Sequence, residues 1–207
     1  MIEFNNKTIL TFFIGIIIVL GLGYVMNYGS KIWTGYSVST SSITYVDNQL
    51  TIDCLNINGK HYDVSLPRGN GCVSGNIGSQ AYNTIQKAVN LVQPGDTVLI
   101  RGGTYRPTAQ IFIDPYLGKG VSGTATNQIT YSNYNNEKVI IDASSLNNGI
   151  LVRAVGYINI KGIEVDNCKN IGIVVNDAHH ITFENIIAKG CATLGMDILG
   201  TYNKVGY

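Results

Sequence analysis

The clearest pattern in the chain is a repeat of short apolar alternations towards its carboxyl end. Residues 158–180 align without gaps over residues 181–203, so the period is 23 residues. A third copy lies upstream, because Gly149 precedes Gly172 and Gly195 at the same spacing. A unit of this size cannot bury both of its faces alone, but stacked units pair each strand with its copies at about 4.8 Å and share one apolar interior. The repeat predicts an all-β fold, a parallel β-helix.

Alternation within each strand separates inward from outward side chains. In the strands that follow the three glycines, the predicted inward pairs are Ile150/Val152, Ile173/Val175 and Met196/Ile198. The predicted outward pairs are Leu151/Arg153, Val174/Asn176 and Asp197/Leu199. On neighbouring strands the alternation predicts two surface ion pairs between adjacent coils, Lys161 with Glu184 and Asp166 with Lys189. The outward columns are where solvent-facing chemistry is expected.

A helical pattern precedes the repeats. Five apolar residues fall on one helical face over residues 81–92, and Pro94-Gly95-Asp96 ends the pattern: Ala81, Ile85, Ala88, Val89 and Val92. This spacing predicts an amphipathic capping helix at the amino-terminal end of the β-helix. Residues 41–66 alternate as short strands around Asp47-Asn48 and Asn58-Gly59, dipeptides typical of hairpins.

The first part of the chain is continuously apolar. Residues 9–26 contain no charged side chain, and a helix of this length spans roughly 27 Å, close to the hydrocarbon thickness of a bilayer. We expect a transmembrane anchor with the rest of the chain exported; a cleaved signal is the alternative. Three regions follow: an anchor or signal at 1–30, a small β-hairpin region at 31–71, and a β-helix at 72–207. The predicted location is membrane-anchored and extracytoplasmic, at the cell surface or envelope.

Charge narrows the choice of partners. Of the 207 residues, 13% are charged and the formal net charge is +1, without a basic tract. Proteins that bind nucleic acid by following its phosphates need a concentration of Lys and Arg. A nucleic-acid partner is therefore not expected.

Four cysteines would reach an oxidising compartment if the chain is exported. Cys54 and Cys72 lie close together in the small region before the repeats, and we expect them to pair. Cys168 and Cys191 occupy equivalent positions one coil apart, which suits either a disulfide or two free thiols at a coil corner. The spacing of the cysteines does not indicate a structural zinc site.

Two segments resemble a known superfamily. Residues 84–105 (TIQKAVNLVQPGDTVLIRGGTY) resemble the cap and first coil of right-handed parallel β-helix proteins of the pectate lyase-like superfamily. Residues 123–144 (GTATNQITYSNYNNEKVIIDAS) resemble the next coil of pectate, alginate and chondroitin lyases, with Gln128 where those lyases usually have Pro. The resemblance implies a uronate-containing polysaccharide ligand on the outer face of central coils. It also implies that the chain, which ends after about three clear coils, is incomplete at its carboxyl end and inactive alone.

A lyase acting on a uronate needs a cation to neutralise the carboxylate and a base to remove the adjacent proton. The resemblance suggests calcium as this cation. The nearest local match is one outer face, with Arg153 as the candidate catalytic residue, Asn176 as a substrate contact and Asp197 as a metal ligand. Tyr157 is a second candidate for substrate binding, through stacking on a sugar ring.

A possible metal cluster at Asp177, His179 and His180 is discounted, because adjacent residues on a strand point to opposite faces. Two functions remain from the sequence. One is a membrane-anchored, exported polysaccharide lyase-like protein that acts on or binds acidic polysaccharides, by calcium-assisted β-elimination if complete. The other is a noncatalytic surface β-helix for glycan binding or adhesion. A hydrolase is a weaker option, since it needs paired carboxylates.

Overall fold

The computed structural model describes residues 26–28, 31–33, 41–75 and 77–206. It divides into two compact units, residues 1–40 and Ser41–Tyr207. In the first unit β1 (Met26–Tyr28) pairs antiparallel with β2 (Lys31–Trp33). The predicted membrane segment at residues 9–26 lies outside the described residues, apart from Met26. No helix in the described part of the chain is long and apolar enough to span a bilayer.

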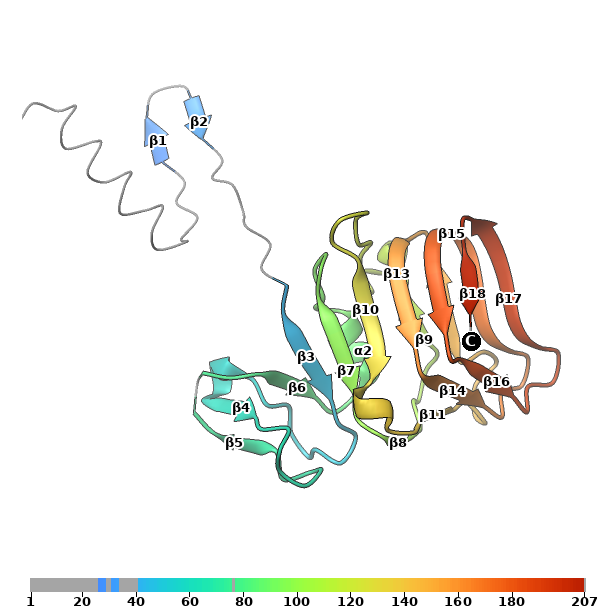
Figure 1. Ribbon diagram of the computed structural model, residues 1–207, viewed down its shortest axis with the longest axis horizontal. Helices are drawn as coiled ribbons and strands as arrows, with labels where there is room; N and C mark the ends of the chain where they lie inside the picture. The colour runs from blue at the N-terminus through green and yellow to red at the C-terminus, as the bar shows by residue number, and fades with distance from the viewer. Residues whose placement is uncertain (1–25, 29–30, 34–40, 76, 207) are drawn as a thin grey trace, which may run out of the picture. The chain divides into compact units, whose positions relative to one another are not determined.

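The second unit is a parallel β-helix built from three ladders of strands (Figure 1). The first ladder contains β3 (Ile43–Val46), β7 (Thr97–Ile100), β10 (Ile129–Asn133), β13 (Gly156–Lys161), the second half of β15 (Ile171–Glu184) and β18 (Lys204–Gly206). The second contains β8 (Gly103–Tyr105), β11 (Val139–Asp142), β14 (Ile163–Asp166) and β16 (Ile187–Lys189). The third contains β9 (Ile111–Ile113), β12 (Ile150–Arg153), the first half of β15, and β17 (Leu194–Thr201).

The register confirms the 23-residue repeat. Ile150 lies beside Ile173 and Ile173 beside Met196, while Ile158 lies beside Ile181 on the next ladder. The inward residues Ile150, Val152, Ile173 and Val175 are buried, and Met196 and Ile198 pack against the same core. Burying a side chain of this size stabilises the fold by about 1.5–3 kcal/mol. Like residues therefore stack over like residues along the interior.

Glycines let neighbouring coils approach closely. Gly149 N–H donates to the Gly172 carbonyl at 3.0 Å, and a Cβ added at Gly172 would lie 2.5 Å from the Gly195 carbonyl oxygen. Larger residues would push the coils apart. Cys168 and Cys191, one coil apart, form a disulfide with a Cα–Cα distance of 4.4 Å, which resolves the choice left open by the sequence.

The amino-terminal lobe (residues 47–79) leaves the β-helix after β3 and rejoins it at β6 (Gln80–Tyr82). It holds η1 (Asn56–Asn58) and an antiparallel pair, β4 (Lys60–Tyr62) with β5 (Cys72–Ser74). The predicted hairpins at 41–66 are wrong. Their first strand, β3, instead pairs in parallel with β6 and β7, because its apolar face joins the ladder of the β-helix.

A helix forms inside the predicted range 81–92 but is shorter. It is α2 (Ile85–Val89), because residues 80–82 are taken into β6, and Thr84 caps it by accepting a bond from Lys87 N–H. Its buried residues Ile85, Ala88 and Val89 belong to the main core. Its role as a cap stays a prediction. The other short helices are η2 (Pro115–Leu117) and η3 (Tyr134–Asn136).

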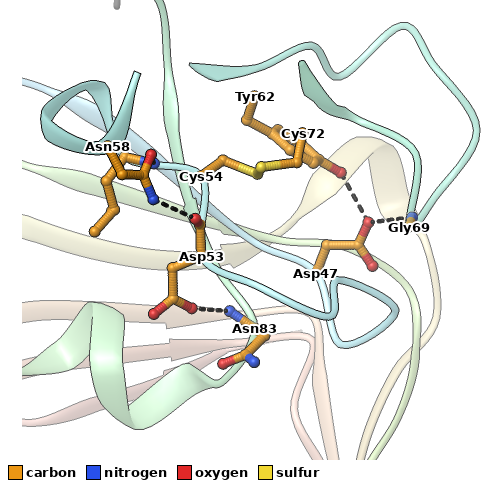
Figure 2. The surroundings of a disulfide bond; sticks show 9 residues. Asp47, Asp53, Cys54, Asn58, Tyr62, Gly69, Cys72 and Asn83 are labelled. Atoms are coloured by element: carbon orange, nitrogen blue, oxygen red, sulfur yellow. Dashed lines mark hydrogen bonds between the residues drawn. A yellow bond between two sulfur atoms is a disulfide. The ribbon is translucent and has the colours of Figure 1, made fainter. Parts of the chain in front are cut away.

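The lobe is held together internally by a disulfide and a buried carboxylate (Figure 2). Cys54 and Cys72, the pair chosen from the sequence, are bonded with a Cα–Cα distance of 5.3 Å. Asp47, fully buried, accepts from Tyr62 Oη at 3.0 Å and from Arg68 Nη2 at 3.0 Å. Tyr62 Oη also accepts from Arg101 Nη1 at 2.9 Å, which links the lobe to the coils. Hydrogen bonds to its ionised form outweigh burial and hold the pKa of Asp47 below its usual range.

Candidate functional site: an outer face and an adjoining cavity

The outer face predicted to carry chemistry is formed by the third ladder. Phe112, Leu151 and Val174 stand in one outward column, and Asp197 follows Val174 in register. Arg153 and Asn176 stand in the next column, side by side. The structure therefore brings Arg153 and Asn176 together. It places Asp197 one column away, because Asp197 follows Val174, not Asn176, at the 23-residue spacing.

Arg153 is held by an acidic partner that the sequence analysis missed. Its guanidinium forms an ion pair with Asp114, whose side chain is fully buried. Asp114 also caps η2 by accepting from Tyr116 N–H at 3.0 Å, and the Arg153 guanidinium lies over the Tyr116 ring at 5.9 Å. This ion pair and the Tyr116 ring direct the guanidinium of Arg153 towards the η2 turn. Arg153 organises this corner, and its predicted catalytic role has no support in the geometry.

The same residues bear on whether calcium fits this face. Calcium takes six to eight oxygen ligands, usually from several carboxylates. Here Asp114 is occupied by Arg153, and Asp197 stands beside the apolar Val174. Among the described residues, no group of three or more His, Cys, Asp or Glu side chains could hold a metal ion. The outer face, as described, does not fit the predicted calcium ion.

Tyr157 lies at a corner of the coil, away from Arg153. Its ring stacks on His180 of the next coil, with centroids 4.6 Å apart and planes at 15°, and His180 stacks in turn on Tyr202 at 5.0 Å. One face of the Tyr157 ring is thus covered by another ring. The proposed stacking of Tyr157 on a sugar through that face is blocked.

The predicted surface ion pairs are half right. Lys161 and Glu184 pair at 2.9 Å, as predicted. Lys189, although it lies in register with Asp166, forms its ion pair with Glu164, which Lys138 also approaches at 3.2 Å. The hydrogen bond from Lys189 lowers the pKa of Glu164. A long lysine side chain can reach across two positions on its neighbour, which strand register alone does not reveal.

A cavity adjoins this face at the start of the β-helix. It has a volume of about 500 Å³ and lies between the beginning of α2, the segment 104–112 and Lys119. Gln86 fixes one wall: its amide accepts from Phe112 N–H at 2.8 Å and donates to the Phe112 carbonyl at 3.0 Å. The turn from Asp114 to Lys119 joins the cavity to the Arg153 corner, since Lys119 N–H donates to the Asp114 carbonyl at 3.0 Å.

The lining of the cavity is rich in donors and positively charged. Arg106 and Lys119 line it, and no Asp or Glu is among its lining residues, all of which the structure describes. Arg106 forms an ion pair with Asp142, with Nε and Oδ2 3.2 Å apart, whereas Lys119 Nζ has no partner among the described residues. Gln110 Nε2 is buried without a hydrogen-bond acceptor. Such a lining suits an anionic ligand that carries many acceptors.

The sequence analysis did not find this cavity. Its residues are Asn48, residues 83–86, residues 104–112 and Lys119, all of which lie outside the 23-residue repeats at 149–203. The available signal was the stretch RPTAQ at 106–110, an interruption between two strands. Loops of this kind carry function more often than the elements that they connect.

Comparison with known proteins agrees with the fold. The model of the family described as Pel9A-like, right handed beta helix region, matches residues 67–205. The chain is 30% identical over 149 residues to "Pectate lyase PEL9" of Emericella nidulans, an alignment that covers 65% of this chain and 34% of that protein. It resembles the crystal structure of pectate lyase Pel9A with a TM-score of 0.56 at 25% identity, over 81% of this chain and 39% of that one.

These matches cover little more than a third of either relative. They nevertheless extend over most of the β-helix described above, including the coils, the disulfide between coils and the segment that lines the cavity. The chain belongs to the Pel9A-like right-handed β-helix family.

Proposed function

We propose that this β-helix binds an acidic polysaccharide of the pectate type, with carboxylated sugar units held in the cavity beside the outer face. The observation that carries the proposal is the lining of that cavity, which includes Arg106 and Lys119 but no Asp or Glu. Two relatives of this chain bear the name pectate lyase, which makes a galacturonate polymer the first ligand to test.

The cavity has hydrogen-bond donors that the protein itself leaves unused. Lys119 Nζ and Gln110 Nε2 are donors without partners among the described residues. A uronate offers a carboxylate to the lysine and ring hydroxyls to the amide, and each hydrogen bond to a charged group contributes about 1.5–3 kcal/mol. A cavity of about 500 Å³ is within the usual range for a small ligand. The exposed face of Phe112 adds an apolar surface for a sugar ring.

We also propose that the protein is exported and anchored in a membrane through residues 9–26. The support is the uncharged apolar run in the sequence, together with two disulfides that suit an oxidising compartment. A polysaccharide ligand outside the cell fits this location. Resistance to alkaline extraction from membranes, lost when residues 1–30 are deleted, is the expected result; release of the intact chain by alkali would contradict anchoring.

The second candidate function is cleavage of the bound polysaccharide, as the names of the two relatives suggest, but the ion pair between Arg153 and Asp114 favours binding without cleavage. Cleavage by β-elimination requires a base that can lose its proton, and Arg153 is not free for that role. Because the outer face does not fit calcium, no step of such a reaction is assigned to it. Unsaturated products formed from polygalacturonate by the full chain, detected by ultraviolet absorbance with and without calcium, would favour the lyase; retained binding without product would favour the binder.

The direct test is calorimetric titration of the full chain, in non-ionic detergent, with tetragalacturonate. The fully methyl-esterified tetramer is the matched ligand control, because it keeps the same sugar units and linkages but carries no carboxylate charge. We expect Lys119→Gln to weaken binding by about tenfold and Arg106→Gln by less, since Arg106 is shared with Asp142. Lys204→Gln, an exposed lysine outside the cavity, should leave binding unchanged.

Two outcomes would contradict the proposal. One is equal affinity for the charged and esterified tetramers, which would remove the role of the carboxylate. The other is an affinity of Lys119→Gln equal to that of Lys204→Gln, which would move binding away from the cavity.

A further inference from the structure

A pair of histidines lies in the second half of β15, at the corner where the third ladder passes into the first. His179 and His180 are consecutive and both exposed. Their Nδ1 atoms are 2.9 Å apart. The neighbours on either side, Ala178 and Ile181, are buried. Two consecutive outward side chains break the strand alternation and bring both imidazoles to the same side.

The backbone explains this arrangement. His180 adopts a left-handed conformation with φ of 53°, and the equivalent residues Tyr157 and Tyr202 have φ of 57° and 56°. A left-handed residue turns the chain at the corner, so the residues before it and at it can both face outwards. Strand alternation assigned the two histidines to opposite faces, and this turn shows why that expectation is wrong.

Both rings are held in place by their surroundings. His180 lies between the rings of Tyr157 and Tyr202, at 4.6 Å and 5.0 Å. His179 is edge-on to Tyr157 at 5.3 Å and covers Gly156, where an added Cβ would lie 2.2 Å from its Cε1. The pair is therefore preorganised, and a ligand that binds both imidazoles would not have to order them first.

The distance between the two nitrogens selects a coordination geometry. With metal–nitrogen bonds of about 2.0 Å, two ligands at a right angle lie about 2.8 Å apart, and two at the tetrahedral angle about 3.3 Å apart. The observed 2.9 Å agrees with the right angle. Square-planar or tetragonal geometry with nitrogen ligands is characteristic of Cu²⁺ and Ni²⁺, and Cu²⁺ binds such sites more strongly.

We propose that His179 and His180 form a surface site for a divalent transition metal ion, Cu²⁺ in preference to Zn²⁺, with water completing the coordination. In the metal-free pair one Nδ1 donates a hydrogen bond to the other. Coordination through both Nδ1 atoms shifts that proton to Nε2 of its own ring, so each imidazole stays neutral and presents a lone pair to the ion.

The test is titration of the full chain with CuCl₂ in non-ionic detergent, followed by calorimetry and electron paramagnetic resonance. We expect one strong site per chain whose spectrum shows coupling to two imidazole nitrogens. The variant His180→Phe keeps a ring between Tyr157 and Tyr202 but removes the ligand, and His179→Ala removes the other. Each should weaken binding by at least about tenfold and abolish the two-nitrogen pattern.

The third histidine of the chain supplies the control. His61 lies in β4 of the amino-terminal lobe, and His61→Ala should leave affinity and spectrum unchanged. A two-nitrogen spectrum that persists in His180→Phe would overturn the proposal, as would its loss in His61→Ala. Zn²⁺ bound as tightly as Cu²⁺ at the pair would contradict the geometric argument. Thermal unfolding of His180→Phe close to that of the parent chain would show that lost binding reflects the missing ligand.

Discussion

The coils and the amino-terminal lobe (residues 47–79) reach stability by different means. In the coils, the same apolar position recurs in each turn, so Ile150, Ile173 and Met196 bury one another in a column. In the lobe, a small apolar cluster is supplemented by a disulfide and by Asp47, which collects bonds from Tyr62 and Arg68. Repetition supports the first region, and single polar contacts support the second.

This difference predicts where truncation is most harmful. Phe183 is the largest fully buried side chain of the core, and Phe183→Ala should lower the free energy of unfolding by about 3–5 kcal/mol. Leu199→Ala, at a position that is 58% exposed on a neighbouring coil, is the control and should change it by less than about 0.5 kcal/mol. Urea unfolding measures both; similar losses would mean that the column is not the main source of stability.

The two disulfides sharpen the comparison, because they close loops of nearly equal length. Their sequence separations are 18 residues in the lobe and 23 in the coils. Loop entropy alone therefore assigns each about 3 kcal/mol, with a difference of roughly 0.2 kcal/mol. Paired Cys→Ser variants of each bridge should lose equal stability in chemical denaturation. A much larger loss in the lobe would show that its folded state, and not only its unfolded chain, depends on the bond.

Two buried tyrosines test whether hydrogen bonds contribute more to stability in the lobe than in the coils. Tyr62 Oη bridges Asp47 and Arg101, whereas Tyr131 Oη is buried with no hydrogen-bond partner in the described part of the chain. Tyr62→Phe should lose about 1–2 kcal/mol at neutral pH, while Tyr131→Phe should lose nothing or gain up to about 1 kcal/mol. A larger loss for Tyr131→Phe would reverse this view of the two regions.

The same tyrosine gives a pH dependence. Burial, followed by the charge of Asp47, raises the pKa of Tyr62 to about 12 from its ordinary 10.0. The protonated form is thus favoured in the folded state, so its contribution is present below pH 10 and is lost as the pH rises towards 12. Tyr62→Phe should flatten this part of the stability curve. An unchanged alkaline limb in that variant would place its origin in the coils, where burial also raises the pKa of Tyr131.

The smallest effect is expected at the surface pair Lys161–Glu184, whose side chains are 36% and 42% exposed. A double-mutant cycle with Lys161→Met and Glu184→Gln should give a coupling of about 0–1 kcal/mol that decreases in high salt. A coupling above this range, or one unaffected by salt, would show that surface ion pairs also contribute to the stability of the coils, besides the buried apolar column.

The coils could be predicted from the sequence because the signal repeats. Each inward position at 150–198 is supported by an equivalent residue 23 positions away, so one ambiguous residue matters little. The hairpins at 41–66 failed for the opposite reason: β3 finds its partners in β6 and β7, which local turn dipeptides do not report.

The candidate site was less accessible to such reasoning. Arg153 could be placed on the outer face, but its partner Asp114 is 39 residues away and outside the repeat. The cavity joins four separate places in the sequence, and the histidine pair depends on a left-handed residue that strand alternation does not encode. Each of these features depends on one long-range contact or one backbone conformation. None of them recurs along the sequence, so no periodic signal predicts it.

The glycine column at 149, 172 and 195 has a consequence for how such a molecule can change its length. Gly149 and Gly172 each approach the carbonyl of the next glycine in the column, so the contact is restored whenever one whole period is added or removed. Duplication of 23 residues lengthens the protein by one rung while every neighbour keeps its partner, whereas a shift of one residue exchanges interior for exterior along the rung. Insertions of whole 23-residue units should therefore preserve the fold, whereas insertions of part of a unit should destabilise it.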